Sequence, residues 1–105
     1  MAYVEIPAAS TRGADVASAA PLVLGNDGNL FHVTGTNNFA GVSTAFWPPG
    51  ADIRLIFDGI LTVTHNSGVP GTGAAKVFLK SAANLVTAAG TTLALSYDGA
   101  IWYEI

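Results

Sequence analysis

Three Asp-Gly pairs constrain this chain more than any other feature of its sequence. They are Asp27-Gly28, Asp58-Gly59 and Asp98-Gly99, and the last two each stand between runs of alternating apolar residues. Asp-Gly is a strong signal for a tight β-hairpin, because glycine adopts a positive φ without steric cost. The sequence therefore predicts short antiparallel hairpins at the second and third pairs.

The apolar pattern also predicts the register of these hairpins, because a three-residue loop separates the apolar side chains more cleanly than a two-residue loop does. In the first hairpin this register gathers on one face Ile53, Leu55, Leu61 and Val63. In the second hairpin it gathers on one face Leu93, Leu95, Ile101, Tyr103 and Ile105, and it places Trp102 on the opposite, more polar face. A ribbon with one apolar face needs a partner sheet. We therefore predict an all-β fold, a small β-sandwich or squat β-barrel.

The chain divides into two parts by composition. Residues 1–20 are rich in Ala, with a few Ser, Thr and Gly residues and with isolated apolar side chains at Tyr3, Val4 and Ile6. This composition is typical of an extended N-terminal arm that becomes ordered when it docks on a surface. Residues 15–20 are the one stretch that suggests a short helix, with Asp15 as its cap. The β domain is expected at residues 21–105, with further strands near 22–24, 30–33, 39–46, 76–79 and 85–87 and a Gly- and Pro-rich loop at 66–75.

The low charge of the chain favours assembly. The chain has 105 residues, of which 50% are apolar and 10% are charged, whereas about 25% are charged in an ordinary soluble domain. A small domain leaves roughly a third of its surface exposed, so uncharged polar residues or another subunit must cover it. The four Lys and Arg residues are scattered, which indicates neither a nucleic-acid partner nor an anionic membrane. The first residues lack the basic region of an export signal, so we expect synthesis and assembly in a cytoplasm.

The polar residues do not indicate catalysis. The seven carboxylates are dispersed, and three of them fall in the Asp-Gly turns, where hydrogen bonding to the backbone accounts for them. A glycosidase needs two carboxylates that face one cleft, and no such pair is indicated. His32 and His65 belong to no cluster with metal-ligand spacing. The sequence therefore predicts that the protein is not an enzyme and that it has no metal or other cofactor.

Three large aromatic side chains are candidates for contacts with another subunit or a ligand. Phe46 and Trp47 precede a rigid Pro-Pro-Gly turn, where they can either plug a corner of the core or anchor a neighbouring subunit. Trp102 falls on the polar face of its predicted hairpin. It is therefore the better candidate for a contact between subunits, or for a ring that stacks on a sugar.

Several blocks of this sequence are similar to a known module. They are residues 22–36 (LVLGNDGNLFHVTGT), 53–66 (IRLIFDGILTVTHN), 81–93 (SAANLVTAAGTTL) and 97–104 (YDGAIWYE). In this order they resemble a structural module of many bacteriophage virion proteins, which occurs in tail fibres, tail spikes and capsid fibres or decorations, usually as trimers. Two positions depart from the module: Thr91 stands where an Asp is frequent, and the segment 78–81 replaces a Leu-Pro-Gly-Gly loop.

The resemblance implies a non-catalytic structural protein of a phage virion, assembled in the cytoplasm of a host bacterium. A tail fibre needs a shaft that 105 residues do not provide, so we expect a capsid decoration protein. It would act as a homotrimer, with the major capsid protein as partner and with Tyr3, Val4 and Ile6 contacting the shell. The alternatives are a receptor- or glycan-binding tail fibre module, which would use Trp47 or Trp102, and a tail accessory protein.

Overall fold

The computed structural model describes residues 11–105, and the regular elements of this part of the chain are all β-strands. The predicted all-β class is therefore confirmed. The strands are β1 (Val16–Ala17), β2 (Leu30–Thr34), β3 (Gly41–Ser43), β4 (Asp52–Phe57), β5 (Thr62–Val63), β6 (Ala74–Phe78), β7 (Leu85–Val86), β8 (Thr92–Tyr97) and β9 (Trp102–Glu104).

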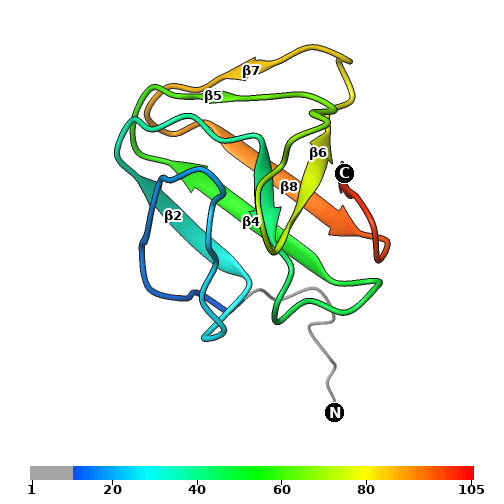
Figure 1. The fold of residues 1–105 in the computed structure, drawn as a ribbon. Helices are drawn as coiled ribbons and strands as arrows, with labels where there is room; N and C mark the ends of the chain where they lie inside the picture. The colour runs from blue at the N-terminus through cyan, green and yellow to red at the C-terminus, as the bar shows by residue number, and fades with distance from the viewer. Residues whose placement is uncertain (1–10) are drawn as a thin grey trace.

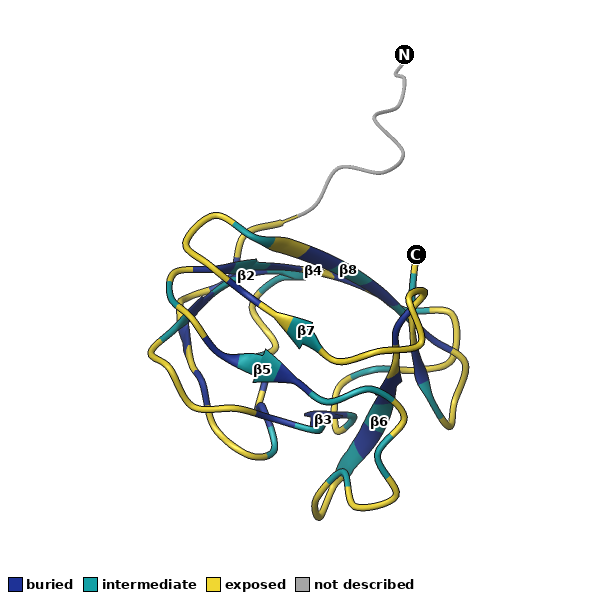
Figure 2. Ribbon diagram, turned by 90° about the horizontal axis from the view of Figure 1, so that it is seen from above, coloured by how far each residue is buried: buried dark blue, intermediate teal, exposed yellow. Residues whose placement is uncertain are grey.

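Seven strands form one sheet in the order β1-β2-β4-β8-β9-β6-β3, and β5 pairs with β7 in a second, two-stranded sheet. The large sheet curls into a half-barrel, and the small sheet lies along its open side (Figures 1 and 2). Isolated bridges connect segments that flank the two sheets: Phe39, before β3, bridges Val63 of β5, and His65, after β5, bridges Val77 of β6. The fold combines parallel and antiparallel pairs, because β4 lies parallel to β2 and antiparallel to β8.

The hairpin predicted at Asp58-Gly59 does not form. β4 pairs with β2 and β8, whereas β5, the strand that follows the turn, pairs with β7. The side chain of Thr87 holds the chain away from β4, since its hydroxyl donates to the carbonyl of Gly59 (2.7 Å) and accepts from the amide of Leu61 (3.0 Å). Asp58-Gly59 is therefore a corner between two sheets. Burial of one face was nevertheless predicted correctly, because Ile53, Leu55, Leu61 and Val63 are all buried.

The β8–β9 hairpin forms, but its predicted register is wrong by one residue. Tyr97 pairs with Trp102 and Ser96 with Tyr103, so the loop has four residues, 98–101. The carboxylate of Asp98 stabilises this longer loop by accepting from the amides of Ala100 (2.8 Å) and Ile101 (2.7 Å). A shift of one residue turns every side chain of a strand to the other face. Trp102 is consequently in the core, and Tyr103 is exposed.

Aromatic rings fill the interior of the half-barrel. Trp102 is fully buried and stacks on Tyr97, with ring centroids 4.8 Å apart. Its indole N–H donates to the carbonyl of Val42 (3.2 Å) and so links β9 to β3 across the core. Trp47 meets Trp102 edge to face at 6.2 Å and Phe31 at 6.4 Å. These contacts bring together strands that are far apart in the sequence.

The segment before Pro21 also contributes to the large sheet. In place of the predicted helix at residues 15–20, Val16–Ala17 forms β1, which pairs in parallel with Val33–Thr34 of β2. Arg12 makes an isolated bridge to Leu30. Strand pairing with β2 is favoured over the weak helical pattern here, because a six-residue helix has almost no stability of its own. The described part of the predicted arm therefore lies against β2.

Replacing Trp102 and its neighbour tests the register of β9. We expect Trp102→Ala to lower the free energy of unfolding by about 3–5 kcal/mol, because it empties a large volume in the core. Tyr103→Ala removes a partly exposed ring and should lower it by about 1 kcal/mol or less. Chemical denaturation measures both values. A larger loss for Tyr103→Ala than for Trp102→Ala would show that the register is wrong.

The turn at Asp98 predicts a pH dependence. Hydrogen bonds from the amides of Ile101 and Ala100 lower the pKa of the Asp98 carboxyl below its ordinary value. A carboxyl with a lowered pKa in the folded state stabilises the fold above its unfolded pKa, and this contribution is lost as pH falls below about 4. Asp98→Asn keeps an acceptor oxygen and does not titrate. We expect the Tm advantage of the wild type over Asp98→Asn at neutral pH to shrink in acid. A gap that does not change with pH would contradict this role.

Candidate interaction surface

The outer face of the large sheet carries apolar and polar side chains in rows that run across the strands. The first row contains Leu30, Arg54, Ala94 and Ile105, as the register of β2, β4 and β8 and the bond from the Ile105 amide to the Ala94 carbonyl (2.9 Å) show. A second row, on one side of the first, contains His32, Ile56 and Thr92. A third, on the other side, contains Asp52, Ser96, Tyr103 and Phe78. We call these three rows the outer face.

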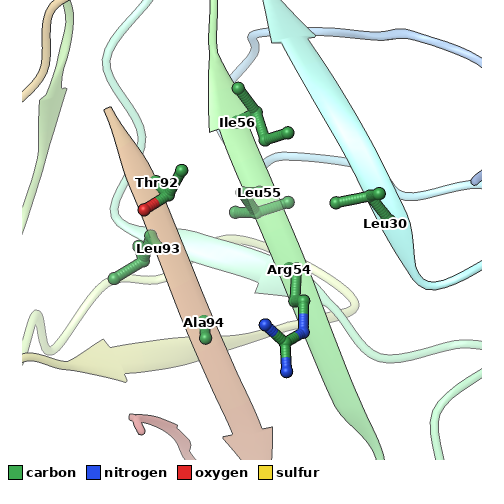
Figure 3. A pocket seen from close by; sticks show the side chains of 7 residues that line it. All are labelled: Leu30, Arg54, Leu55, Ile56, Thr92, Leu93 and Ala94. Atoms are coloured by element: carbon green, nitrogen blue, oxygen red, sulfur yellow. The ribbon is translucent and has the colours of Figure 1, made fainter. Parts of the chain in front are cut away.

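A groove of about 330 Å³ lies across β2, β4 and β8 on the outer face. Its side chains come from three neighbouring strands, namely Leu30 from β2, Arg54 and Ile56 from β4, and Thr92 and Ala94 from β8 (Figure 3). Leu30, Ile56 and Ala94 are half-buried, whereas Arg54 is exposed. The groove is therefore mainly apolar and has one cationic side chain. We call it the outer groove.

Beside the groove, exposed rings form a second apolar surface. The ring centroids of Phe78 on β6 and Tyr103 on β9 are 5.6 Å apart. Ile105, the residue directly after β9, has 56% of its surface exposed. We call Phe78, Tyr103 and Ile105 the aromatic patch. Sequence reasoning missed it, because the shifted register assigned Tyr103 and Ile105 to the core. The alternation of Leu93, Leu95 and Tyr97 could have revealed the patch. It places Tyr97 on the inward face of β8, so its partner on β9 must also face inward, and that partner is Trp102.

The candidate aromatic residues predicted from the sequence have different positions. Trp102 is buried, so it reaches neither another subunit nor a sugar. Trp47 is half-buried against Phe31 and Trp102, which fits the corner plug, although its indole N–H has no partner among residues 11–105. Phe46 is 54% exposed and remains available for a contact. The other predicted contacts, Tyr3, Val4 and Ile6, lie outside the described residues.

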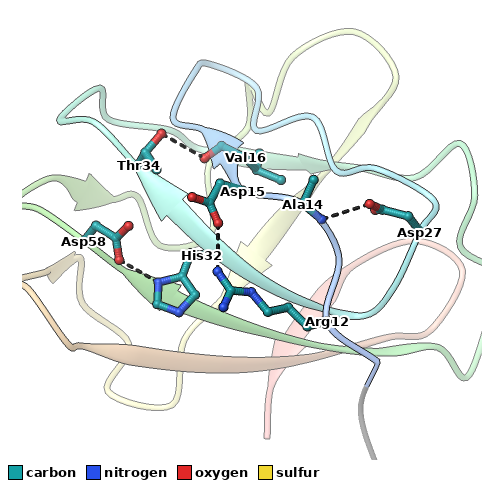
Figure 4. Close-up of polar contacts among 8 residues, drawn as sticks. All are labelled: Arg12, Ala14, Asp15, Val16, Asp27, His32, Thr34 and Asp58. Atoms are coloured by element: carbon teal, nitrogen blue, oxygen red, sulfur yellow. Dashed lines mark hydrogen bonds and ion pairs between the residues drawn. The ribbon is translucent and has the colours of Figure 1, made fainter.

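The two histidines have local partners. Nδ1 of His32 lies 2.7 Å from a carboxylate oxygen of Asp58, on the exposed side of the sheet (Figure 4). Nδ1 of His65 accepts from the amide of Leu79 (3.0 Å), and its ring lies 4.7 Å from that of Phe78. Within residues 11–105, no three His, Asp or Glu side chains are grouped so that they could hold a metal ion. The same range contains no helix that is long and apolar enough to cross a membrane.

The N-terminal end of the described chain is fixed against the start of β2. The carbonyl of Thr11 accepts from the amides of Asn29 (2.8 Å) and Leu30 (3.1 Å). A carboxylate oxygen of Asp27 accepts from the amide of Ala14 at 2.9 Å (Figure 4). A Cβ at Gly28 would lie 2.4 Å from the Thr11 carbonyl oxygen, so this close approach requires glycine. These contacts place Thr11 beside Leu30, at one end of the outer groove.

Comparisons with protein-family models, with curated proteins and with solved structures gave no match. The function of the chain is therefore inferred from its own sequence, its fold and its outer face.

Gly28→Ala tests the attachment of the N-terminal segment to β2. Because the added methyl would collide with backbone atoms of residues 11–13, we expect a loss of about 1–3 kcal/mol in the free energy of unfolding. NMR should show the largest shift changes at Thr11–Gly13 and Asn29–Leu30. Gly68→Ala is the control, since a Cβ there meets no atom within 4 Å. Equal losses of unfolding free energy in Gly28→Ala and Gly68→Ala would argue against the close approach of Gly28 to residues 11–13.

Proposed function

We propose that this chain is a non-catalytic structural protein of a bacteriophage virion, a capsid decoration protein that binds the head shell as a homo-oligomer. Two sequence features support the proposal: the resemblance of its ordered blocks to phage virion modules and the low charge. The structural observation that carries it is the aromatic patch, which leaves two rings and Ile105 exposed on one side of a small domain.

The aromatic patch has the chemistry of a subunit interface. Aromatic side chains are enriched at the centres of protein interfaces, and charged side chains are depleted there. Ser96, the neighbour of Tyr103 on β8, is uncharged, and Asp52 on β4 is the charged side chain that follows in the same row. A second copy that covers Phe78, Tyr103 and Ile105 would remove this apolar surface from water, which stabilises the association by about 25 cal/mol for each Å² that is buried. Many weak contacts of this kind add up when a symmetric oligomer binds a symmetric shell.

Mixing the protein with undecorated capsids of the same phage tests the proposal directly. Electron cryo-microscopy of the pelleted shells should show added density at fixed symmetry positions, and decorated shells should resist heat better than bare ones. Bare shells, together with virions that carry the protein on the tail, would reject the decoration role and favour the tail module. A soluble protein of similar size, added to the same shells, controls for trapping in the pellet.

A charge in the aromatic patch should disrupt self-association. We expect Ile105→Asp to weaken the association constant at least about tenfold, because a buried carboxylate at an interface has no partner. Sedimentation equilibrium over a range of concentrations measures this constant. Val69→Asp is the matched control, since Val69 is 83% exposed in the loop between β5 and β6, away from the patch residues in sequence. An unchanged mass for Ile105→Asp, or dissociation by Val69→Asp alone, would exclude the patch as the interface.

A further inference from the structure

We infer that the outer groove is the docking site for the N-terminal segment of the same chain, residues Tyr3–Ile6. Three observations support this: the position of Thr11, the length of the preceding chain and the chemistry of the groove. The inference does not rest on the proposed function, because groove and segment belong to one molecule.

The described chain begins at one end of the groove. Leu30, the groove residue on β2, donates its amide hydrogen to the carbonyl of Thr11 (3.1 Å), and the amide of Gly13 donates to the carbonyl of Leu30 (2.9 Å). From Thr11 to Val16 the chain runs parallel to β2. The described chain therefore begins, at Thr11, beside the start of β2 and next to the groove.

The preceding residues are long enough to cover the groove. Tyr3 and Ile6 are eight and five residues from Thr11, and an extended chain spans about 3.3 Å per residue, which gives a reach of about 16–26 Å. From β2 to β8 the groove crosses two strand spacings, about 10 Å. The segment can therefore reach Arg54 and Ala94 of its own sheet without displacing Thr11 from β2.

The segment and the groove have complementary chemistry. Leu30, Ile56 and Ala94 offer apolar surface, which Tyr3, Val4 and Ile6 would cover. The guanidinium of Arg54 has no carboxylate within 4.0 Å among residues 11–105; the Arg–carboxylate pair found there is Arg12–Asp15. Glu5 is the one carboxylate in the first ten residues of the sequence. It is thus the acid that a docked segment would bring to Arg54.

Tethering favours the segment of the same chain over that of a second copy. A short flexible connection holds a ligand near its site at an effective concentration in the millimolar range. A second copy in dilute solution is present at a far lower concentration, so it would have to bind much more tightly to compete. A docked segment would have to leave the groove before Tyr3, Val4 and Ile6 could make the predicted contact with the shell.

A spin label placed near the start of the chain tests the docking. The chain has no cysteine, so Ala2→Cys carries a nitroxide at one defined position in the full-length protein. We expect strong relaxation broadening of the amide signals of Arg54, Ile56, Thr92 and Ala94. A sample of spin-labelled, unenriched protein mixed with unlabelled, 15N-enriched protein should show none. Broadening in the mixed sample would overturn the inference in favour of a second copy, and broadening confined to residues near Thr11 would overturn it altogether.

Two sets of variants test the chemistry of the contact with the same label. Ile6→Asp should remove the broadening at Ala94, because the carboxylate loses its hydration in the apolar groove. Arg54→Glu should weaken the broadening, and the added change Glu5→Arg should restore it, since the pair is then reversed in sign. Lys80→Glu is the matched control on an exposed lysine outside the groove and should leave the pattern unchanged. No restoration in the double variant, or equal losses in Lys80→Glu, would contradict the pairing of Glu5 with Arg54.

Discussion

The rest of the structure depends on β4, the middle one of the three strands that form the outer groove. This strand pairs with β2 on one side and with β8 on the other, and Ile53, Leu55 and Phe57 point into the core with no exposed surface. Burial of three such side chains contributes about 5–9 kcal/mol, which is comparable to the whole stability of a small domain. These three side chains belong to the same buried core as Leu61 and Val63 near the two-stranded sheet and as the rings of Tyr97 and Trp102.

The alternation that buries one face of β4 also determines the outer face. Arg54 and Ile56 point away from the core. Arg54 lies between Leu30 and Ala94, and the outer groove forms where the side chain of Ala94 is short. On the far side of Ala94, Ile105 leads to the aromatic patch. The outer face is thus one continuous surface for which we propose two uses: the groove for the N-terminal segment and the patch for another subunit. The low charge of the chain is consistent with both.

Sequence reasoning predicted the class of the fold, because alternation of apolar residues is a local signal. It also placed in the core six residues that are buried, namely Ile53, Leu55, Leu61, Val63, Leu93 and Leu95. It failed at pairing. The Asp58-Gly59 turn has the composition of a hairpin, but Thr87, 28 residues after Gly59, holds the following segment against β7. It also failed at the β8–β9 loop, where hydrogen bonds to Asp98 stabilise four loop residues instead of three. This error of one residue in the loop length placed Tyr103 in the predicted core and Trp102 on the predicted surface. The aromatic patch could therefore not be found from composition alone.

The pairing of β4 is the central claim, and cross-strand nuclear Overhauser effects measure it most directly. We expect backbone contacts between Leu55 and Phe31 on one side and between Arg54 and Ala94 on the other, with slowly exchanging amides in β4. Backbone contacts between residues 53–57 and residues 60–64, as in a hairpin closed by Asp58-Gly59, would contradict it. The outer groove and the row that leads to the aromatic patch would then not exist as described.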